Sequence, residues 1–188
     1  HNGNTPIVLI NRYIESMKEN CIFLENERGG YMATDYILSL GHKDIAYISG
    51  PMYKRDARDR LQGHQRALSE HGIMFDPALW FEGNFREFGG SDAMHHLLSL
   101  NKKFTAVVCA SDQMASGAIA VCLEQGIRVP EDISFIGYDN IPFPQYISPK
   151  LTTVSNPINE MGKMAAFWVL QHVYKNQKVD VNCSFSPE

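Results

Sequence analysis

Histidine residues are the first candidates for chemistry in this sequence, because imidazole groups bind metals and transfer protons. His95 and His96 are adjacent, so on a helix their side chains diverge by about 100° and cannot share a metal ion. His42, His64 and His71 are isolated near predicted helix ends, where an imidazole commonly caps the helix or is solvated. The sequence contains no H-E-x-x-H, G-x-S-x-G or phosphate-loop pattern. We therefore predict no catalytic residue, no bound metal and no cofactor.

A second set of polar and aromatic residues comes directly after apolar segments that read as strands. In open α/β sheets the carboxyl ends of the strands face the ligand crevice. A guanidinium and a carboxylate can each form paired hydrogen bonds with neighbouring hydroxyls, and an aromatic face covers the apolar side of a sugar ring. The set therefore predicts a binding site for a small polyol. Its members are Lys54, Asp56, Arg60, Phe85, Ser111, Asp112 and Asp139.

Each of these residues, taken alone, is explained equally well as a helix N-cap or a surface ion pair. Asp112 begins a predicted helix, where a carboxylate is stabilising whether or not a ligand exists. The segment EDISFIGYDN, residues 131–140, is also consistent with a strand that ends in a solvated turn. The joint placement of the residues after successive strands is what favours binding.

The elements that must position these residues follow an alternating pattern. Apolar runs predict strands at 5–11, 21–25, 44–51, 79–85, 104–110, 128–140 and 151–157, with an extended tail at 181–188. Helical periodicity predicts helices at 29–42, 57–72, 91–100, 111–126 and about 159–174. Gly41, Gly72 and Gly126 are predicted helix stops, and Ser91 is a predicted N-cap. The alternation predicts an α/β fold with parallel sheets, helices on both faces and right-handed crossovers.

Composition excludes several classes of protein. With 188 residues, of which 44% are hydrophobic, the chain is long enough to bury a core. Its 17 basic and 21 acidic residues give a net charge of −4, so this chain by itself is not expected to bind DNA. The four cysteines are widely spaced and lack a C-x-x-C pattern, which predicts free thiols in a reducing cytoplasm. No run is long enough for a membrane helix, and no signal segment is recognisable at the start.

Several long segments carry a resemblance to a known family. The segments GGYMATDYILSLGHKDIAYISGP, DRLQGHQRAL, FTAVVCASDQMASGAIAVCLEQGIRVPEDISFIGYDN and SPKLTTVSNP together resemble the effector-binding core of the LacI/GalR family of bacterial transcription repressors. VLINR and RLQG are most similar to the galactose repressor branch. The similarity covers essentially the whole chain, with the segments in the same order and spacing.

The resemblance implies a periplasmic-binding-protein-like fold of two doubly wound parallel-sheet lobes, one of them incomplete here, with the effector in the cleft between them. Residues 1–42 and 155–180 would belong to the DNA-proximal lobe. Residues 43–154 and 181–188 would form the distal lobe. The DNA-binding helix-turn-helix of the family lies upstream and is absent from this chain, so the sequence is expected to be a sensor fragment.

The resemblance also assigns roles to individual residues. Arg60 matches the family's effector-clamping arginine, and Asp139 matches the carboxylate that accepts hydrogen bonds from a hydroxyl or a ring N–H. Phe85 falls where relatives place an aromatic side chain against the ligand. Lys54 and Asp56 occupy variable contact positions.

Two further positions complete the site that the resemblance implies. Asn156 is at a hinge-side position that in relatives can reach the cleft. Sugar-responsive relatives usually carry Asn-Asp where this chain has Ser111 and Asp112. A serine offers one hydroxyl in place of a two-pronged amide, which weakens the case for a hexose.

The resulting hypothesis is a cytoplasmic transcription regulator that senses a small effector, a sugar or related polyol before a purine, and has no membrane partner. Similarity to the family implies a homodimer, with contacts through the helix 113–123 and the loop 141–146. Two alternatives remain: a periplasmic sugar-binding protein that serves a transporter, and an α/β enzyme acting on a small polar substrate. An upstream signal peptide would favour the first alternative, and turnover of a ligand would favour the second.

Overall fold

The computed structural model describes residues 6–142, 148–175 and 180–188. The chain forms two compact units. Unit 1 combines His1–Glu25 with Asn156–Glu188, and unit 2 is Asn26–Ser155. The chain therefore passes from one unit to the other after Glu25 and again after Ser155.

These boundaries differ from the predicted ones by one residue at Ser155 and by whole elements at two other places. Residues 26–42 belong to unit 2, because helix α1 (Asn26–Ser39) packs against helix α2 (Arg55–Glu70). Residues 181–188 belong to unit 1, because strand β8 (Ser184–Phe185) pairs with strand β2 (Cys21–Leu24). An amphipathic pattern identifies a helix or a strand but does not specify the partner against which it packs.

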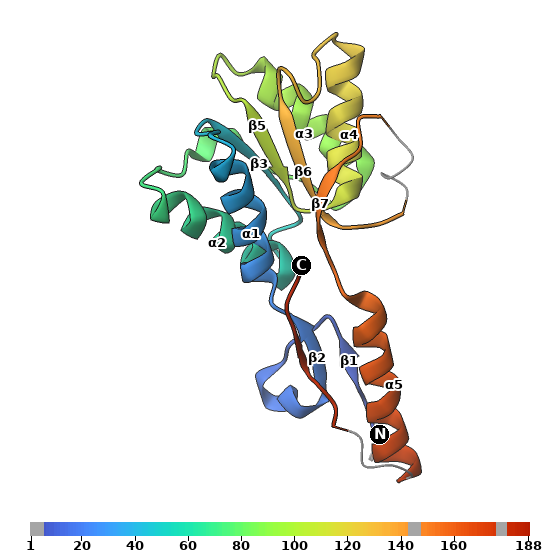
Figure 1. Cartoon of the computed structure of the whole chain (residues 1–188). Helices are drawn as coiled ribbons and strands as arrows, with labels where there is room; N and C mark the ends of the chain where they lie inside the picture. Colours follow the sequence, from blue (N-terminus) through green and yellow to red (C-terminus); the bar gives the residue numbers. More distant parts are fainter. Residues whose placement is uncertain (1–5, 143–147, 176–179) are drawn as a thin grey trace. The chain divides into compact units, whose positions relative to one another are not determined.

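Unit 2 is built on a parallel five-stranded sheet with the order β4-β3-β5-β6-β7 (Figure 1). Its strands are β3 (Ile45–Ser49), β4 (Trp80–Glu82), β5 (Ala106–Cys109), β6 (Ser134–Asp139) and β7 (Thr152–Ser155). Strand order reverses at β3, because the chain moves outward to β4 and then returns to β5 on the other side of β3. Such a switch point is where ligands bind in doubly wound sheets.

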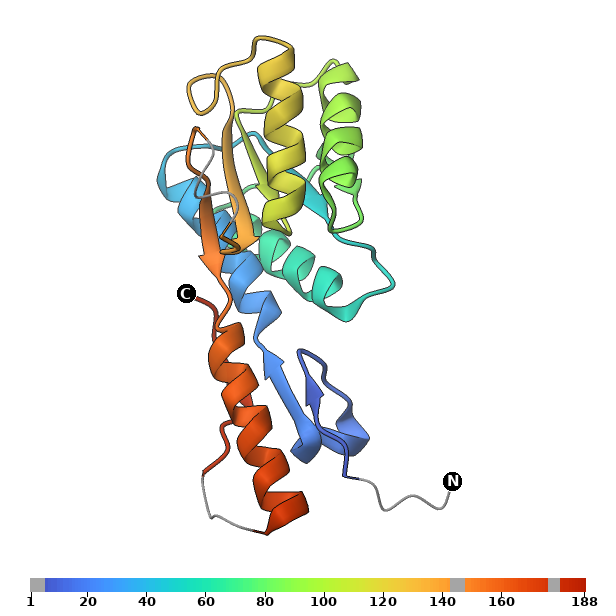
Figure 2. The same ribbon diagram turned by 90° about the vertical axis from the view of Figure 1, so that its right-hand side faces the viewer.

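Two pairs of helices cover the two faces of this sheet (Figure 2). Helices α1 and α2 pack together on one face, and α3 (Glu87–Ser99) and α4 (Asp112–Glu124) pack together on the other. Every residue of β3 and β5 is buried, as expected for parallel strands that are covered on both sides. The predicted α/β fold with a parallel sheet is confirmed.

The predicted helix ends are mostly confirmed. Gly41, Gly72 and Gly126 all have positive φ angles, of 90°, 71° and 74°, a conformation that glycine adopts without strain. The predicted start of α3 is wrong. The helix begins at Glu87, with Arg86 as its N-cap, so Ser91 lies inside it. A serine is a good N-cap, but here one more turn of helix precedes it.

Unit 1 contains a small parallel sheet with the order β1-β2-β8, in which β1 is Leu9–Ile10. Helix α5 (Ile158–Tyr174) packs on it and buries Met161, Ala165 and Trp168. The indole N–H of Trp168 donates to the Glu19 carbonyl at 3.0 Å. A short 3₁₀ helix, Glu15–Asn20, occupies the predicted loop. Residue 5 of the predicted first strand lies outside the described residues.

The cysteines are free thiols, as predicted. Cys21, Cys109 and Cys122 are buried, and Cys183 is half-buried. Burial raises the pKa of the Cys122 thiol to about 11, so it stays protonated and unreactive at neutral pH. Among the described helices, none is long and apolar enough to cross a membrane.

His64 was expected to cap a helix or to be solvated, and the structure shows that it is part of the core of unit 2. Only 1% of the residue is exposed. Its ring stacks on Tyr47 with the centroids 4.4 Å apart, and its Nδ1 is 2.9 Å from the Thr34 hydroxyl. Burial disfavours the imidazolium and lowers the pKa of His64 to about 3.

The buried imidazole predicts a loss of stability in mild acid. Below pH 6.5 the unfolded chain takes up a proton at His64 that the folded protein does not bind. The free energy of unfolding therefore decreases as the pH decreases. Between pH 7.5 and pH 5 this amounts to about 2 kcal/mol. Urea unfolding measures the free energy of unfolding at pH 7.5 and at pH 5. Between these two pH values the wild type should lose about 2 kcal/mol more than His64→Gln does.

The matched control is His95→Gln, which replaces an exposed histidine on α3. It should keep the pH dependence of the wild type. Equal pH dependence in the wild type and in His64→Gln would show that His64 is not kept neutral by burial.

Candidate functional site

The carboxyl ends of the unit 2 strands bring most of the predicted site residues to one edge of the sheet. All five strands are parallel, so the segments that leave them start from the same edge. All eight predicted residues lie at or after these strand ends, and seven of them belong to unit 2: Lys54, Asp56, Arg60, Phe85, Ser111, Asp112 and Asp139. Asn156 follows β7 and begins the second chain segment of unit 1, and its role as a ligand contact stays a prediction.

Arg60 is the most buried cation of the set, with 3% of its side chain exposed. It lies in the second turn of α2. Its Nε donates to the Asn26 side-chain oxygen at 2.8 Å, and its Nη1 donates to the carbonyl of Ala110 at 2.6 Å. A buried charge is costly unless hydrogen bonds and counter-charges compensate it. These contacts tie α2 to the start of α1 and to the end of β5.

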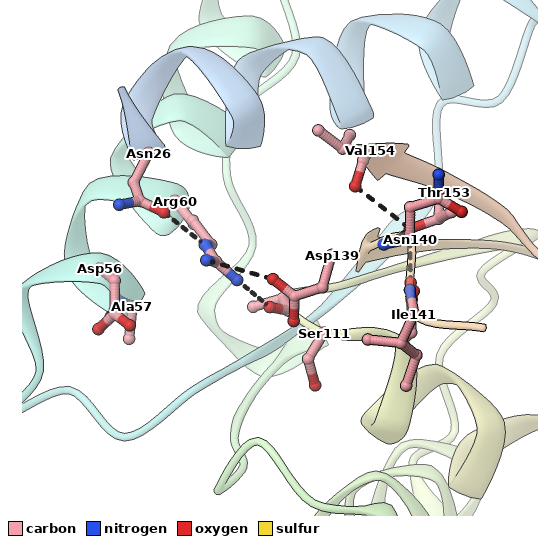
Figure 3. Close-up of polar contacts among 12 residues, drawn as sticks. Asn26, Asp56, Ala57, Arg60, Ser111, Asp139, Asn140, Ile141, Thr153 and Val154 are labelled. Atoms are coloured by element: carbon pink, nitrogen blue, oxygen red, sulfur yellow. Dashed lines mark hydrogen bonds and ion pairs between the residues drawn. The ribbon is translucent and has the colours of Figure 1, made fainter. Parts of the chain in front are cut away.

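Asp139 supplies the opposite charge. Its Oδ1 lies 3.7 Å from Nη2 of Arg60 (Figure 3). The two side chains meet although 79 positions separate them in the sequence. A distance of 3.7 Å is an ion pair but too long for a hydrogen bond between these two atoms. One third of the Asp139 side chain is exposed, so the carboxylate forms the accessible end of a charge pair whose other end is buried.

Two aromatic rings flank the arginine. The Arg60 guanidinium carbon lies 3.6 Å from the ring centroid of Tyr138 and 5.7 Å from that of Phe85. Lys54 Nζ is 5.1 Å from the Phe85 centroid, so both cations lie within reach of one ring face. Phe85 packs where a side chain on Gly50 would collide with it. The site therefore combines two cations, a carboxylate and a half-buried aromatic ring.

The remaining predicted residues make contacts within the protein. Ser111 is the N-cap of α4, and its hydroxyl accepts from the Met114 N–H at 3.3 Å. Asp56 accepts from the Ala57 N–H in the first turn of α2. Asp112 is 1% exposed and accepts hydrogen bonds from Ile141 and Thr153.

No group of three or more His, Cys, Asp or Glu side chains that could hold a metal ion occurs within residues 6–142, 148–175 and 180–188. What the described site offers is charge-assisted hydrogen bonding and an aromatic surface.

Comparison with known proteins places this geometry in a family. The family of periplasmic binding protein-like domains matches residues 34–185. The transcriptional regulator GalR of Escherichia coli (strain K12) is 39% identical over 181 residues, which are 96% of this chain and 53% of GalR. A crystal structure of a LacI family regulator from Mycobacterium smegmatis is 30% identical, with a TM-score of 0.87, and the match covers 98% of this chain and 68% of that one.

The chain belongs to the LacI/GalR family of transcriptional regulators. It spans about half the length of the curated relative that it matches. A sugar-binding LacI family regulator from Escherichia coli, crystallised with phosphate, has a TM-score of 0.91 and 28% identity, and the match covers 97% of this chain and 66% of that one. These relatives are transcriptional regulators.

Two site residues of this LacI/GalR chain were missed by sequence reasoning. Asn26 holds the Arg60 guanidinium, and Tyr138 lies against it. Tyr138 directly precedes Asp139 in an apolar strand, so the sequence pattern indicates a core residue at this position. Asn26 follows the strand CIFLE, and its position after a strand end was the available signal.

The Asn26–Arg60 hydrogen bond predicts a stability difference between two substitutions. Asn26→Leu removes the acceptor and leaves a buried N–H of a cation unsatisfied, which costs about 1–3 kcal/mol. Asn26→Asp keeps an oxygen at that position and should cost less. Urea unfolding of both variants measures the difference. If Asn26→Leu were as stable as the wild type, Asn26 would not be needed to hold Arg60.

Proposed function

We propose that this chain is the effector-sensing part of a cytoplasmic transcriptional repressor, and that it binds a small sugar or related polyol at the carboxyl edge of the unit 2 sheet. The observation that carries the proposal is the meeting of Arg60 and Asp139 beside Phe85. Three elements that are distant in the sequence supply these groups, and they converge at a strand-order switch point.

The paired charges of Arg60 and Asp139 favour a neutral, hydroxyl-rich ligand. Arg60 and Asp139 compensate each other, so neither requires a charged ligand. Together they offer donors and acceptors to adjacent hydroxyl groups, and Phe85 offers an aromatic face to the C–H side of a sugar ring. The Escherichia coli relative described as sugar-binding supports this class. A purine is the second candidate, because Asp139 can also accept from a ring N–H.

Regulation requires that the effector bind one conformation of the protein more tightly than another, since differential affinity alone shifts such an equilibrium. DNA binding would come from a helix-turn-helix outside this chain. GalR is named as an HTH-type regulator, which supports that arrangement.

We also propose a homodimer, as the family resemblance implies. Met114 and Val121 are buried within unit 2, so a contact through α4 would use its exposed residues, such as Leu123. Most of the proposed contact loop 141–146 lies outside the described residues. Light scattering on the full-length protein tests this part, and a monomeric mass would contradict it.

Effector binding by Asp139 is tested with a ligand panel and one conservative variant. D-galactose, D-ribose, cellobiose, adenosine and hypoxanthine are screened by thermal shift on the full-length protein, because a ligand stabilises the folded state that it binds. Asp139→Asn should then weaken binding by about 10- to 100-fold, since it loses a charge-assisted hydrogen bond of about 1.5–3 kcal/mol. Asparagine also tolerates the left-handed backbone at this position. Calorimetry measures the affinity.

Asp132→Asn is the matched control. Asp132 precedes β6, whereas Asp139 ends it, so both substitutions remove one negative charge beside the same strand. Asp132 pairs with Arg128 on the surface, and its replacement should leave the affinity unchanged. Equal affinity of wild type and Asp139→Asn would remove Asp139 from the site, and lack of binding by all five compounds would contradict the proposed ligand class.

A further inference from the structure

The carboxylate of Asp112 is surrounded by hydrogen-bond donors from a different part of the sheet. Its residue begins α4. Oδ2 accepts from the backbone N–H of Ile141 at 2.9 Å, and Oδ1 accepts from the hydroxyl of Thr153 at 2.5 Å. With 1% of the residue exposed, Asp112 presents almost no surface to a ligand. Its contacts are directed to the segment that follows β6 and to β7.

The last residue of β6 and the residue after it have an unusual backbone. Asp139 and Asn140 have φ angles of 109° and 54°. Residues with a Cβ rarely adopt positive φ, and such conformations persist when the surrounding structure holds them in place. Asp139 is the residue whose carboxylate faces Arg60. Something must therefore hold this turn against its local preference.

Asp112 contacts the chain on both sides of that turn. On one side, a Cβ at Gly137 would collide with Asp112 Oδ1, so the absence of a side chain at Gly137 lets the carboxylate approach the strand. On the other side, Ile141 donates its N–H to the same carboxylate. Figure 3 shows Ile141 and Thr153 beside Asn140. The two contacts bracket residues 138–140.

We propose that Asp112 is a positioning residue, which holds the strained Asp139–Asn140 turn in the conformation that directs the Asp139 carboxylate toward Arg60. The consequence for ligand affinity rests on the proposed function, because it requires that Asp139 contact the effector. The effect on the turn itself does not depend on the proposed function.

The charge state of Asp112 gives this role a pH dependence. Burial raises the pKa of Asp112 to about 6, hydrogen bonds from Thr153 and Ile141 lower it, and the charge of Asp139 raises it. The ionisable groups that interact with Asp112 are Asp139 at the end of β6 and the Cys109 thiol of β5, whose pKa burial and Asp112 both raise. A protonated Asp112 still bonds to its neighbours, but without the strength of charge-assisted hydrogen bonds. The turn should therefore loosen as pH falls through about 6.

Hydrogen exchange of the peptide that covers residues 137–142, measured by mass spectrometry on the full-length protein, tests the effect on the turn. After correction for intrinsic rates, Asp112→Asn should exchange about tenfold faster than the wild type at pH 8. The two proteins should exchange alike at pH 5, because asparagine resembles the protonated acid. Equal exchange rates of Asp112→Asn and the wild type at pH 8 would overturn the proposal. An increase in exchange rate of the same size in all peptides of unit 2 would also overturn it, because it would indicate a general loss of stability.

A second variant and a control separate positioning from general stability. Thr153→Val removes a donor that lowers the Asp112 pKa, so it should move the midpoint of the wild-type pH profile to higher pH without removing the carboxylate. An unmoved midpoint would contradict the proposed coupling. Asp132→Asn, at the opposite end of β6, should keep the wild-type profile.

Calorimetry with D-galactose, D-ribose, cellobiose, adenosine and hypoxanthine provides the functional measurement. For the compound that binds, Asp112→Asn should weaken binding about three- to tenfold at pH 8 and not at pH 5. Unchanged affinity at pH 8 would overturn the role of Asp112 in binding. If none of these compounds binds the wild type, the proposed ligand class fails, while the exchange profile still decides whether Asp112 holds the turn.

Discussion

A guanidinium group that is 3% exposed must be surrounded by acceptors and opposite charge, and this requirement organises the edge of unit 2. Arg60 draws together the first residue of α1, the carbonyl after β5, the ring of Tyr138 and the carboxylate at the end of β6. Three segments that are separate in the sequence are thus fixed around one side chain. The charge that a ligand would use is also the charge that assembles its surroundings.

Backbone strain is concentrated at the same edge. Phe85, Asp139 and Asn140 all have positive φ angles, although none is glycine. Asparagine tolerates this region better than other residues with a Cβ, but Phe85 and Asp139 rarely adopt it, so tertiary contacts must maintain their conformations. For Phe85 the contact is with Gly50, and for the turn after β6 the carboxylate of Asp112 contacts both flanks. Strain held by surrounding structure is typical of sites whose geometry serves a function.

Family membership and site geometry support the same conclusion from independent directions. The comparisons identify a LacI/GalR chain, and Arg60 and Asp139 beside Phe85 offer the donors, acceptors and aromatic surface that the proposed ligand would require. Asn26 is the first residue of unit 2, where the chain enters from unit 1, and it contacts Arg60 directly. The residue that would clamp a ligand is therefore bonded to one of the two points at which the chain passes between the units.

The sequence by itself determined the alternation of strands and helices, the glycine helix stops and the placement of Arg60 and Asp139 after strands of one sheet. These features follow from local periodicity and from the rule that parallel strands end at one edge. Only the tertiary structure decided that His64 is a core residue, that Asn26 and Tyr138 hold Arg60, and that residues 26–42 and 181–188 join the units they do. It also decided that Asp112 bonds to the turn beside Asp139. Each of these depends on which distant segments pack together, and the local pattern of a segment carries no information about its partner.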